Sequence, residues 1–282
     1  IVSFVYFFRK NQEPTGVVMS TGEAIYTEDE LNQLIMEKEE AAVEDVLAYI
    51  RESLQGGKST VAVLRELYPN QTVLVADNRY HFFEMNEKLA KNPYANENFK
   101  VDENGVVEYN DGMTISKKGI DVSKFQGKIN WSKVNADGVE YAFIRMGYRG
   151  YGSSGKLVMD ETFEDNIKGA TSNGVDVGVY FFSQAVTEEE AIEEANYILS
   201  AIEGYDVTYP IVIDIEEVTD SDARTAKLTK EEWTRNCIAF CETVKAAGYT
   251  PMIYGNLKTF FIMLDMEQLE MYDKWFAYYD TP

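Results

Sequence analysis

From residue 119 onward, six short runs rich in apolar and β-branched residues alternate with amphipathic helical patterns. The runs are GIDVS, YAFIRMG, VGVYFFS, PIVIDIE, PMIYGN and KWFAYY. Strands that alternate with helices at this spacing predict parallel pairing through crossover helices. Such an α/β fold is either a β/α barrel or an open doubly wound sheet. In both, a functional site lies at the carboxyl ends of the strands.

The helical patterns between these runs have recognisable ends. Thr187 with Glu190, and Thr229 with Glu232, have the spacing of capping boxes, and Asp160 precedes a third helical pattern. The helix after Thr229 carries an apolar stripe that predicts a core-facing side and two buried cysteines. The stripe consists of Trp233, Cys237, Phe240, Cys241 and Val244.

The first 117 residues follow a different pattern. Thr27 with Glu30 predicts a capping box that opens a long helix ending at Gly56, and a shorter helix is expected over residues 60–68. Two β-rich hairpins follow, with turns at residues 77–78 and 104–105. We therefore predict a small α+β N-terminal module or stalk over residues 1–117 and a second domain over residues 118–282. The single histidine, His81, lies beside aromatic residues and is expected to be partly buried and structural.

Charge and composition exclude several classes of function. Lys and Arg total 26 against 48 Asp and Glu, so the formal net charge is −22, and a phosphate backbone would be repelled. One histidine and two cysteines cannot build a multi-His or Cys-rich metal site. We expect no nucleic-acid partner, no metal and no cofactor.

The first eight residues, IVSFVYFF, are apolar and precede Arg9 and Lys10. One interpretation is the end of a membrane anchor whose remainder lies upstream of residue 1, and the other is a buried first strand. No stretch of this sequence approaches the roughly 20 apolar residues needed to cross a bilayer.

The fourth run ends in two acidic residues. Side chains alternate along a strand, so Asp214 and Glu216 share one face, opposite Ile213 and Ile215. Burial and mutual repulsion raise carboxyl pKa values, so one group stays protonated as a general acid beside an ionised partner, as glycosidic cleavage requires. Asp-x-Glu also arises by chance in so acidic a chain, but its place at the end of an apolar strand favours function.

Another carboxyl group, Asp121, ends the first run. In a barrel it opens onto the same face as the fourth run, so it either approaches the acidic pair or serves as a turn or helix-capping residue.

Residues 118–282 resemble the catalytic module of the family 25 glycoside hydrolases, the N-acetylmuramidase lysozymes. The matching motifs, in the order of the family, are GIDVSKFQGKINW, YAFIRMGYRGYG, LVMDETFEDNIKGA, VGVYFFSQA, YPIVIDIE, PMIYGN and WFAYY. The resemblance implies a β/α barrel that cleaves the β-1,4 bond between N-acetylmuramic acid and N-acetylglucosamine in peptidoglycan. It further implies a monomer that acts on glycan strands outside the cell or at its surface, without a cofactor.

The resemblance also assigns roles to residues. Glu216 would be the general acid, and Asp214 would stabilise the developing positive charge or orient the N-acetyl group of the substrate. Asp121 would line the same cleft as a third acidic residue. Sugar-stacking walls would come from Tyr180, Tyr254, Trp275 and Tyr278, and Arg145 would support the site with its charge.

One departure from the family and two alternatives qualify this interpretation. The barrel of the family ends with a further strand that carries an Asp, whereas this sequence stops at Pro282, so we expect an incomplete barrel. Family 18 chitinases and related glycosidases use Asp-x-Asp-x-Glu, which would require Asp in place of Val212. The remaining alternative is a non-catalytic protein that binds cell-wall glycan.

Overall fold

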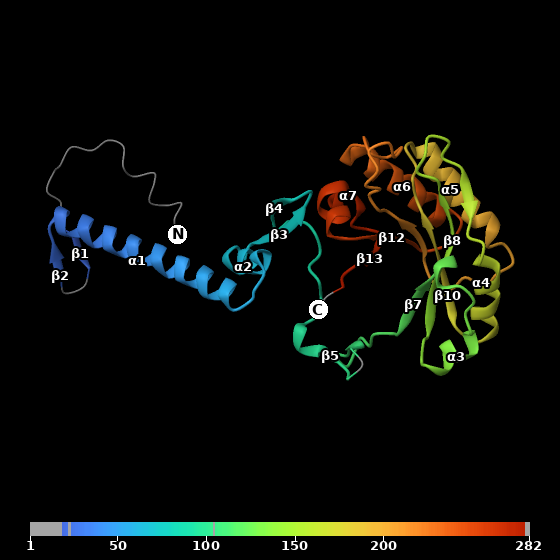
Figure 1. Cartoon of the computed structure of the whole chain (residues 1–282), viewed down its shortest axis with the longest axis horizontal. Helices are drawn as coiled ribbons and strands as arrows, with labels where there is room; N and C mark the ends of the chain where they lie inside the picture. Colours follow the sequence, from blue (N-terminus) through green and yellow to red (C-terminus); the bar gives the residue numbers. More distant parts are fainter. Residues whose placement is uncertain (1–18, 22–23, 104, 280–282) are drawn as a thin grey trace. The chain divides into compact units, whose positions relative to one another are not determined.

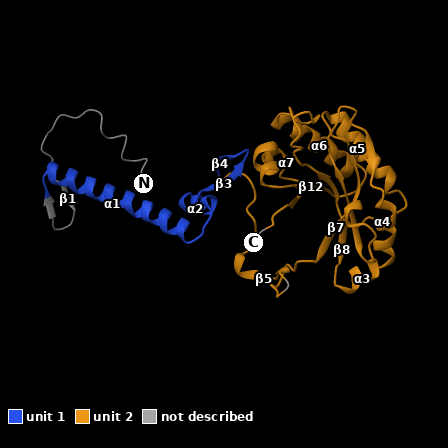
Figure 2. Cartoon of the chain, viewed as in Figure 1, with its two compact units in different colours: residues 1–84 blue, residues 85–282 orange. Residues whose placement is uncertain are grey.

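The structure is a computed structural model that describes residues 19–21, 24–103 and 105–279, with side chains from Tyr26 onward. The chain forms two compact units, residues 1–84 and residues 85–282 (Figure 2). They are described separately below.

The first unit begins with an antiparallel pair, β1 (Met19–Thr21) and β2 (Ala24–Tyr26), followed by α1 (Glu28–Gln55). The predicted capping box is confirmed: the Thr27 hydroxyl accepts from the Glu30 amide, and the Glu30 carboxylate accepts from the Thr27 amide at 2.9 Å. The helix ends at Gly56, as predicted. All 28 residues of α1 are described, and none of them is buried.

A short helix and a hairpin complete this unit. Helix α2 (Thr60–Leu67) precedes β3 (Gln71–Ala76) and β4 (Arg79–Glu84), which pair antiparallel around Asp77 and Asn78. Both turn residues have positive φ, +52° and +57°, the left-handed conformation that a two-residue hairpin turn requires. His81 is half-buried and stacks on Phe83, as expected of a structural histidine.

The second unit is built on one curled sheet, seen edge-on at the right of Figure 1. Its six parallel strands are β7 (Gly119–Val122), β8 (Tyr141–Arg149), β10 (Asp176–Phe182), β11 (Ile211–Asp214), β12 (Pro251–Gly255) and β13 (Asp273–Phe276). They pair in chain order, with no reversal of direction across the sheet. Sequential order is the topology of a β/α barrel, because a doubly wound sheet reverses at a switch point. The sheet is therefore an incomplete barrel, as predicted.

The crossover helices pack along the outer side of the sheet (Figure 1). They are α3 (Trp131–Ala136), α4 (Phe163–Ser172), α5 (Glu188–Ala201) and α6 (Lys230–Ala246), and a short α7 (Met266–Leu269) precedes β13. Two single-turn elements, η3 (Lys124–Gln126) and η4 (Thr259–Met263), follow β7 and β12. Thr229 forms the predicted capping box with Glu232. At α5 only half of the box forms, because the Glu190 carboxylate accepts from the amide of Val186 and pairs with Arg224 instead.

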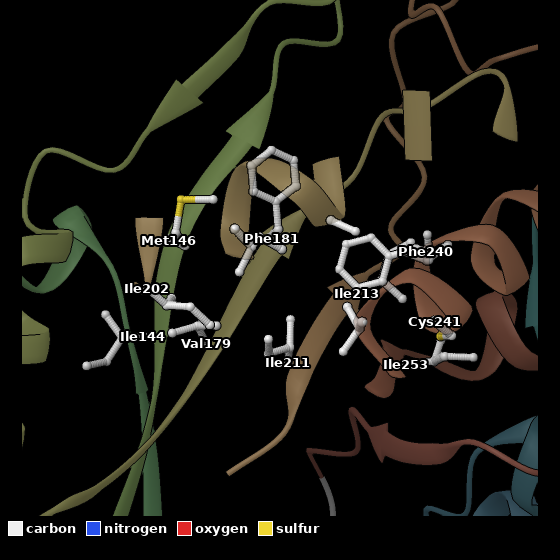
Figure 3. Close-up of a cluster of buried hydrophobic side chains, with 14 of the residues drawn as sticks. Ile144, Met146, Val179, Phe181, Ile202, Ile211, Ile213, Phe240, Cys241 and Ile253 are labelled. Carbon is white, nitrogen blue, oxygen red and sulfur yellow. The ribbon is translucent and has the colours of Figure 1, made fainter. Parts of the chain in front are cut away.

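The core lies between the sheet and these helices (Figure 3). Strand residues that point outward, such as Ile144, Phe181 and Ile213, are fully buried against it. The predicted stripe of α6 is confirmed: Trp233, Cys237, Phe240, Cys241 and Val244 are all buried, and both cysteines are free thiols.

Two features differ from the sequence-based expectations. A short strand, β9 (Leu157–Met159), pairs antiparallel with the end of β8, and the helix that the Asp160 motif predicted begins at Phe163.

Residues 85–117, with η2 (Asn96–Asn98), β5 (Phe99–Val101) and β6 (Val107–Tyr109), lie in the second compact unit. The predicted domain boundary after residue 117 remains a prediction. The apolar residues 1–8 and Asn104 of the second predicted turn lie outside the described residues.

Candidate active site

The inner face of the curled sheet carries the candidate site. Because side chains alternate, the residues opposite the buried core positions of each strand point inward. The parallel register then sets neighbours side by side: Asp214 pairs with Tyr254, and Tyr254 pairs with Trp275. Tyr180 is paired with Val212 on one side and with Arg145 on the other. The sequence therefore brings acidic and aromatic groups together at the carboxyl ends of the strands.

These side chains surround a cleft of about 230 Å³. Seven of the eight predicted site residues line it, and Arg145 does not. The lining consists of Asp121, Tyr180, Asp214, Glu216, Tyr254, Trp275, Phe276, Ala277, Tyr278 and Tyr279.

The acidic pair lies where β11 ends. Asp214 is 5% exposed, and its Oδ1 atom is buried without a hydrogen-bond partner among the described residues. Burial, followed by the charge of Glu216 and a hydrogen bond to it, raises the pKa of Asp214 well above its ordinary value. Glu216 is only half-buried. A buried carboxyl group of raised pKa therefore lies beside a carboxyl group that solvent reaches.

The backbone on both sides of the pair is held in place. The Ser183 amide donates to the Asp214 carbonyl at 3.0 Å, and the Ile215 amide donates to the Tyr254 carbonyl at 3.1 Å. The next residue, Glu217, is exposed, lies outside the cleft lining and pairs with Lys258 at 2.5 Å. Two consecutive glutamates therefore have different surroundings, as strand alternation predicts.

Asp121 lines the cleft from β7. Its surroundings raise its pKa through burial, although part of the side chain stays open to solvent. The sequence left open whether Asp121 caps the next turn. Ser123 takes that role, since its hydroxyl accepts from the Phe125 amide in a capping box with Gln126.

The aromatic wall of the cleft is centred on Trp275. Its ring lies 4.7 Å from the ring of Tyr254 and 6.2 Å from that of Tyr180, both edge to face, and stacks on Phe143 at 4.7 Å. Phe143 can lie there because Gly178 has no side chain: a Cβ at that position would be 2.4 Å from the Phe143 ring. Burial raises the pKa of both Tyr180 and Tyr254, so their hydroxyls remain neutral donors.

Sequence reasoning missed part of this wall. Phe276 and Tyr279 also line the cleft, and Phe276 stacks on Tyr278 at 6.0 Å. The two-residue period of a strand, followed from Trp275 through Ala277, would have identified Tyr279.

Arg145 lies beside the cleft lining. Its side chain is 12% exposed, and its guanidinium pairs with Asp160 at 2.6 Å. The same guanidinium is 5.0 Å from the Phe125 ring centroid. Its positive charge opposes the effect of burial on both Tyr180 and Asp214. Arg145 thus lies outside the cleft lining, and its supporting role remains a prediction.

A second ionic group, which sequence reasoning also missed, lies beyond the end of β10. Glu194 of α5 is fully buried and accepts from Arg149 Nε at 2.7 Å and from the Ser183 hydroxyl at 2.6 Å. Burial raises the pKa of Glu194 to about 7, against the opposing effect of these partners. The group ties α5 to the segment that follows the Tyr180 strand.

The part of the chain that the structure describes lacks two further features. No three Asp, Glu, His or Cys side chains in the ranges with coordinates are grouped to hold a metal ion. In the same ranges, no helix is long and apolar enough to span a membrane.

Comparison with known proteins decides the family. The family model described as "Glycosyl hydrolases family 25" matches residues 120–282, more than half of the chain. The chain belongs to glycosyl hydrolase family 25. Its family 25 region contains all six parallel strands except the first residue of β7, and every residue of the cleft lining.

Curated proteins and solved structures that this family 25 chain resembles agree with the match. Lysozyme M1 of Streptomyces globisporus is 33% identical over 106 residues, which cover 36% of this chain and 34% of that protein. The uncharacterized protein YegX of Escherichia coli K12 is 27% identical over 144 residues, covering 49% and 47%. The chain thus spans no more than about half of these relatives. The modular autolysin LytC of Streptococcus pneumoniae shares the fold, with a TM-score of 0.52 at 20% identity, over 74% of this chain and 50% of LytC.

Proposed function

We propose that this chain hydrolyses the β-1,4 bond between N-acetylmuramic acid and N-acetylglucosamine in peptidoglycan. The observation that carries the proposal is that the buried Asp214 and the half-buried Glu216 line the same aromatic-walled cleft at the end of β11. Membership of family 25 supports it, as do the relatives named lysozyme and autolytic lysozyme. Another structure of LytC, with a TM-score of 0.51, contains a synthetic peptidoglycan ligand.

In this proposal Glu216 is the general acid. It is the member of the pair that solvent reaches, so it can give a proton to the oxygen of the leaving sugar. Asp214, buried and with Oδ1 unpartnered, stabilises the positive charge that develops on the sugar ring or orients the N-acetyl group. Asp121 completes the acidic cluster from the neighbouring edge of the sheet.

Sugar binding is assigned to the aromatic wall. Tyr180, Tyr254, Trp275 and Tyr278 present ring faces and edges to the cleft, and flat aromatic surfaces suit the apolar faces of sugar rings. Arg145 supports the acidic cluster with its charge. No step of this chemistry calls on a metal or a cofactor.

The two alternatives differ in what they require. A family 18 mechanism needs a carboxylate where Val212 is fully buried on the inner face of β11. A non-catalytic glycan-binding protein would use the same aromatic wall without turnover. We propose the muramidase because a buried carboxyl group of raised pKa lies beside Glu216 within the cleft, an arrangement that glycan binding alone does not need.

The place of action follows from the substrate. We propose that the chain is a monomer that works on glycan strands outside the cell or at its surface. Attachment through a membrane anchor upstream of residue 1 remains a prediction, because residues 1–8 lie outside the described part of the chain.

The test is incubation of the chain with purified peptidoglycan, followed by reduction of the newly formed sugar ends and their identification by mass spectrometry. Ends in N-acetylmuramic acid support the proposal. Ends in N-acetylglucosamine would reassign the bond, and co-sedimentation with peptidoglycan without new ends would favour the binding protein.

A further inference from the structure

The carboxylate of Asp160, outside the cleft lining, is held by donors from three elements. Its side chain has no exposed surface. Oδ1 accepts from the amide and the hydroxyl of Thr162 at 2.9 and 2.8 Å, before α4. Oδ2 accepts from the Lys124 amide of η3 at 3.1 Å and from Arg145 Nε of β8 at 2.7 Å. Burial alone would raise the pKa of Asp160, but these donors keep it below its ordinary value, so the group is an anion.

Arg145 of β8 is the main ionic partner of this anion. It is adjacent in register to Tyr180, and its charge favours the ionised form of Asp214. One guanidinium nitrogen, Nη2, lies 2.6 Å from Asp160 Oδ2 in the ion pair but has no hydrogen bond of good geometry. The ion pair and the Nε hydrogen bond therefore hold the guanidinium group at Asp160.

The cleft contains carboxyl groups that could compete with Asp160 for this guanidinium group. Asp121, Asp214 and Glu216 gather there, and an arginine has enough side-chain freedom to move toward them. An arginine paired directly with Asp214 or Glu216 would keep the pair ionised and remove the proton that an acid needs.

We propose that Asp160 is a positioning residue that keeps Arg145 behind the cleft, so that the arginine supports the acidic pair without forming an ion pair with it. The expected effect of Asp160 on catalysis rests on the proposed muramidase function. The electrostatic part of the proposal concerns the titration of Asp214 in the free protein.

The groups that face the acidic pair come from every strand around it. They are Asp121 of β7, Arg145 of β8, Tyr180 of β10, Tyr254 of β12 and Tyr279 after β13. Of these, only Arg145 is a cation, so a change in its position has the largest effect on the pair.

The first experiment follows the carboxyl carbon of Asp214 by NMR during a pH titration of the full chain labelled with ¹³C-aspartate, assigned with Asp214→Asn. In Asp160→Asn, Asp214 is expected to titrate about 1 to 3 pH units lower than in wild type. Asp137→Asn, which removes an exposed ion pair with Lys118 in the same unit, should leave the titration unchanged. An unchanged titration in Asp160→Asn would overturn the proposal, whether or not the wild type cuts peptidoglycan.

The second experiment separates positioning from a merely structural role. On peptidoglycan, Asp160→Asn is expected to lower kcat at least tenfold with little change in KM, and to move the pH profile toward acid. Adding Arg145→Gln should restore part of the lost kcat, because no arginine then remains to enter the cleft. A double variant no more active than Asp160→Asn would contradict the proposal.

A milder variant covers the case in which Asp160→Asn does not fold. Thr162→Val keeps the charge of Asp160 and removes one of its hydrogen bonds. It should shift the titration of Asp214 in the same direction by a smaller amount, and a normal titration together with a lowered melting temperature would reduce Asp160 to a structural residue.

Discussion

Helices α1 and α6 begin with the same local arrangement and have opposite surroundings. Each opens on a threonine whose hydroxyl and amide exchange hydrogen bonds with a glutamate three residues later. Yet α6 buries seven side chains against α5, the sheet and adjacent segments, whereas α1, described over its full length, buries none. Capping signals therefore fix where a helix starts, and the neighbouring strands decide what it packs against. The candidate site lies in the unit whose helices have such neighbours.

The largest expected effect is a loss of catalysis in the second unit, which contains α6 and the candidate site. Glu216→Gln is expected to lower peptidoglycan hydrolysis by roughly 10²- to 10⁴-fold, because an amide cannot serve as the acid. The control is Glu217→Gln at the adjacent exposed position, which should retain activity close to wild type. Initial rates of reducing-end release measure both. Equal losses in the two variants would refute the assignment of the acid.

Core substitutions test the comparison directly. Phe240→Ala in α6 removes a fully buried ring, so the free energy of unfolding is expected to fall by about 3 to 5 kcal/mol. Leu47→Ala in α1 truncates a side chain that is 47% exposed, and a change within about 0.5 kcal/mol is expected. Urea unfolding followed by circular dichroism gives both values. A large loss for Leu47→Ala would show that α1 packs against a partner.

The buried Glu194 makes stability depend on pH. The pKa of Glu194 is about 7 in the folded chain, against 4.5 for an ordinary glutamate. At pH values between these two, the folded chain therefore binds more protons than the unfolded chain. The stabilising contribution of the protonated group is complete below about pH 4.5 and is lost as the pH rises through about 7. The expected loss is about 1 to 3 kcal/mol.

Thermal melts of wild type and Glu194→Gln from pH 4.5 to 8 measure this effect. The variant should lose this part of the pH dependence, whereas Glu193→Gln, at a 59% exposed partner of the same arginine, should keep it. Parallel curves for wild type and Glu194→Gln would contradict the prediction.

The smallest effects concern the two matching caps. Thr229→Ala is expected to lower the stability of the second unit by about 1 kcal/mol, because it removes the acceptor for the Glu232 amide. Thr27→Ala removes the same contact at α1, and we expect local fraying there without a change in the unfolding of the sheet. Hydrogen exchange at the first turns of both helices distinguishes the two responses.

Much of the fold was predictable because its signals are local. The six parallel strands, the capped helices and the acidic pair all follow from periodicity and end signals in single segments. The strand β9, the incomplete capping box at Glu190 and the Arg149–Glu194 pair were not predictable. Each depends on a contact between segments far apart in sequence, such as Glu190 with Arg224, for which no local pattern exists.

In the candidate site, too, some residues could be predicted from the sequence and the placement of others could not. Asp214, Glu216 and the aromatic residues were found by alternation and by the family resemblance, and their roles remain a proposal. The place of Arg145 behind the cleft could not be deduced, since it depends on Asp160 and on the ring of Phe125. Long side chains on one face can turn toward either neighbour, and only the tertiary partners select the direction.

The pairing of the strands in chain order has a consequence for synthesis. A ribosome delivers β7 first and β13 later, so each new strand meets a neighbour that has already emerged. Asp214 and Glu216 leave the ribosome before Tyr254 and Trp275, two of the aromatic residues proposed to bind the sugar. A nascent chain paused at that stage carries the acids and Tyr180 but lacks the rest of the aromatic wall, so the cleft is complete only after translation has passed β13.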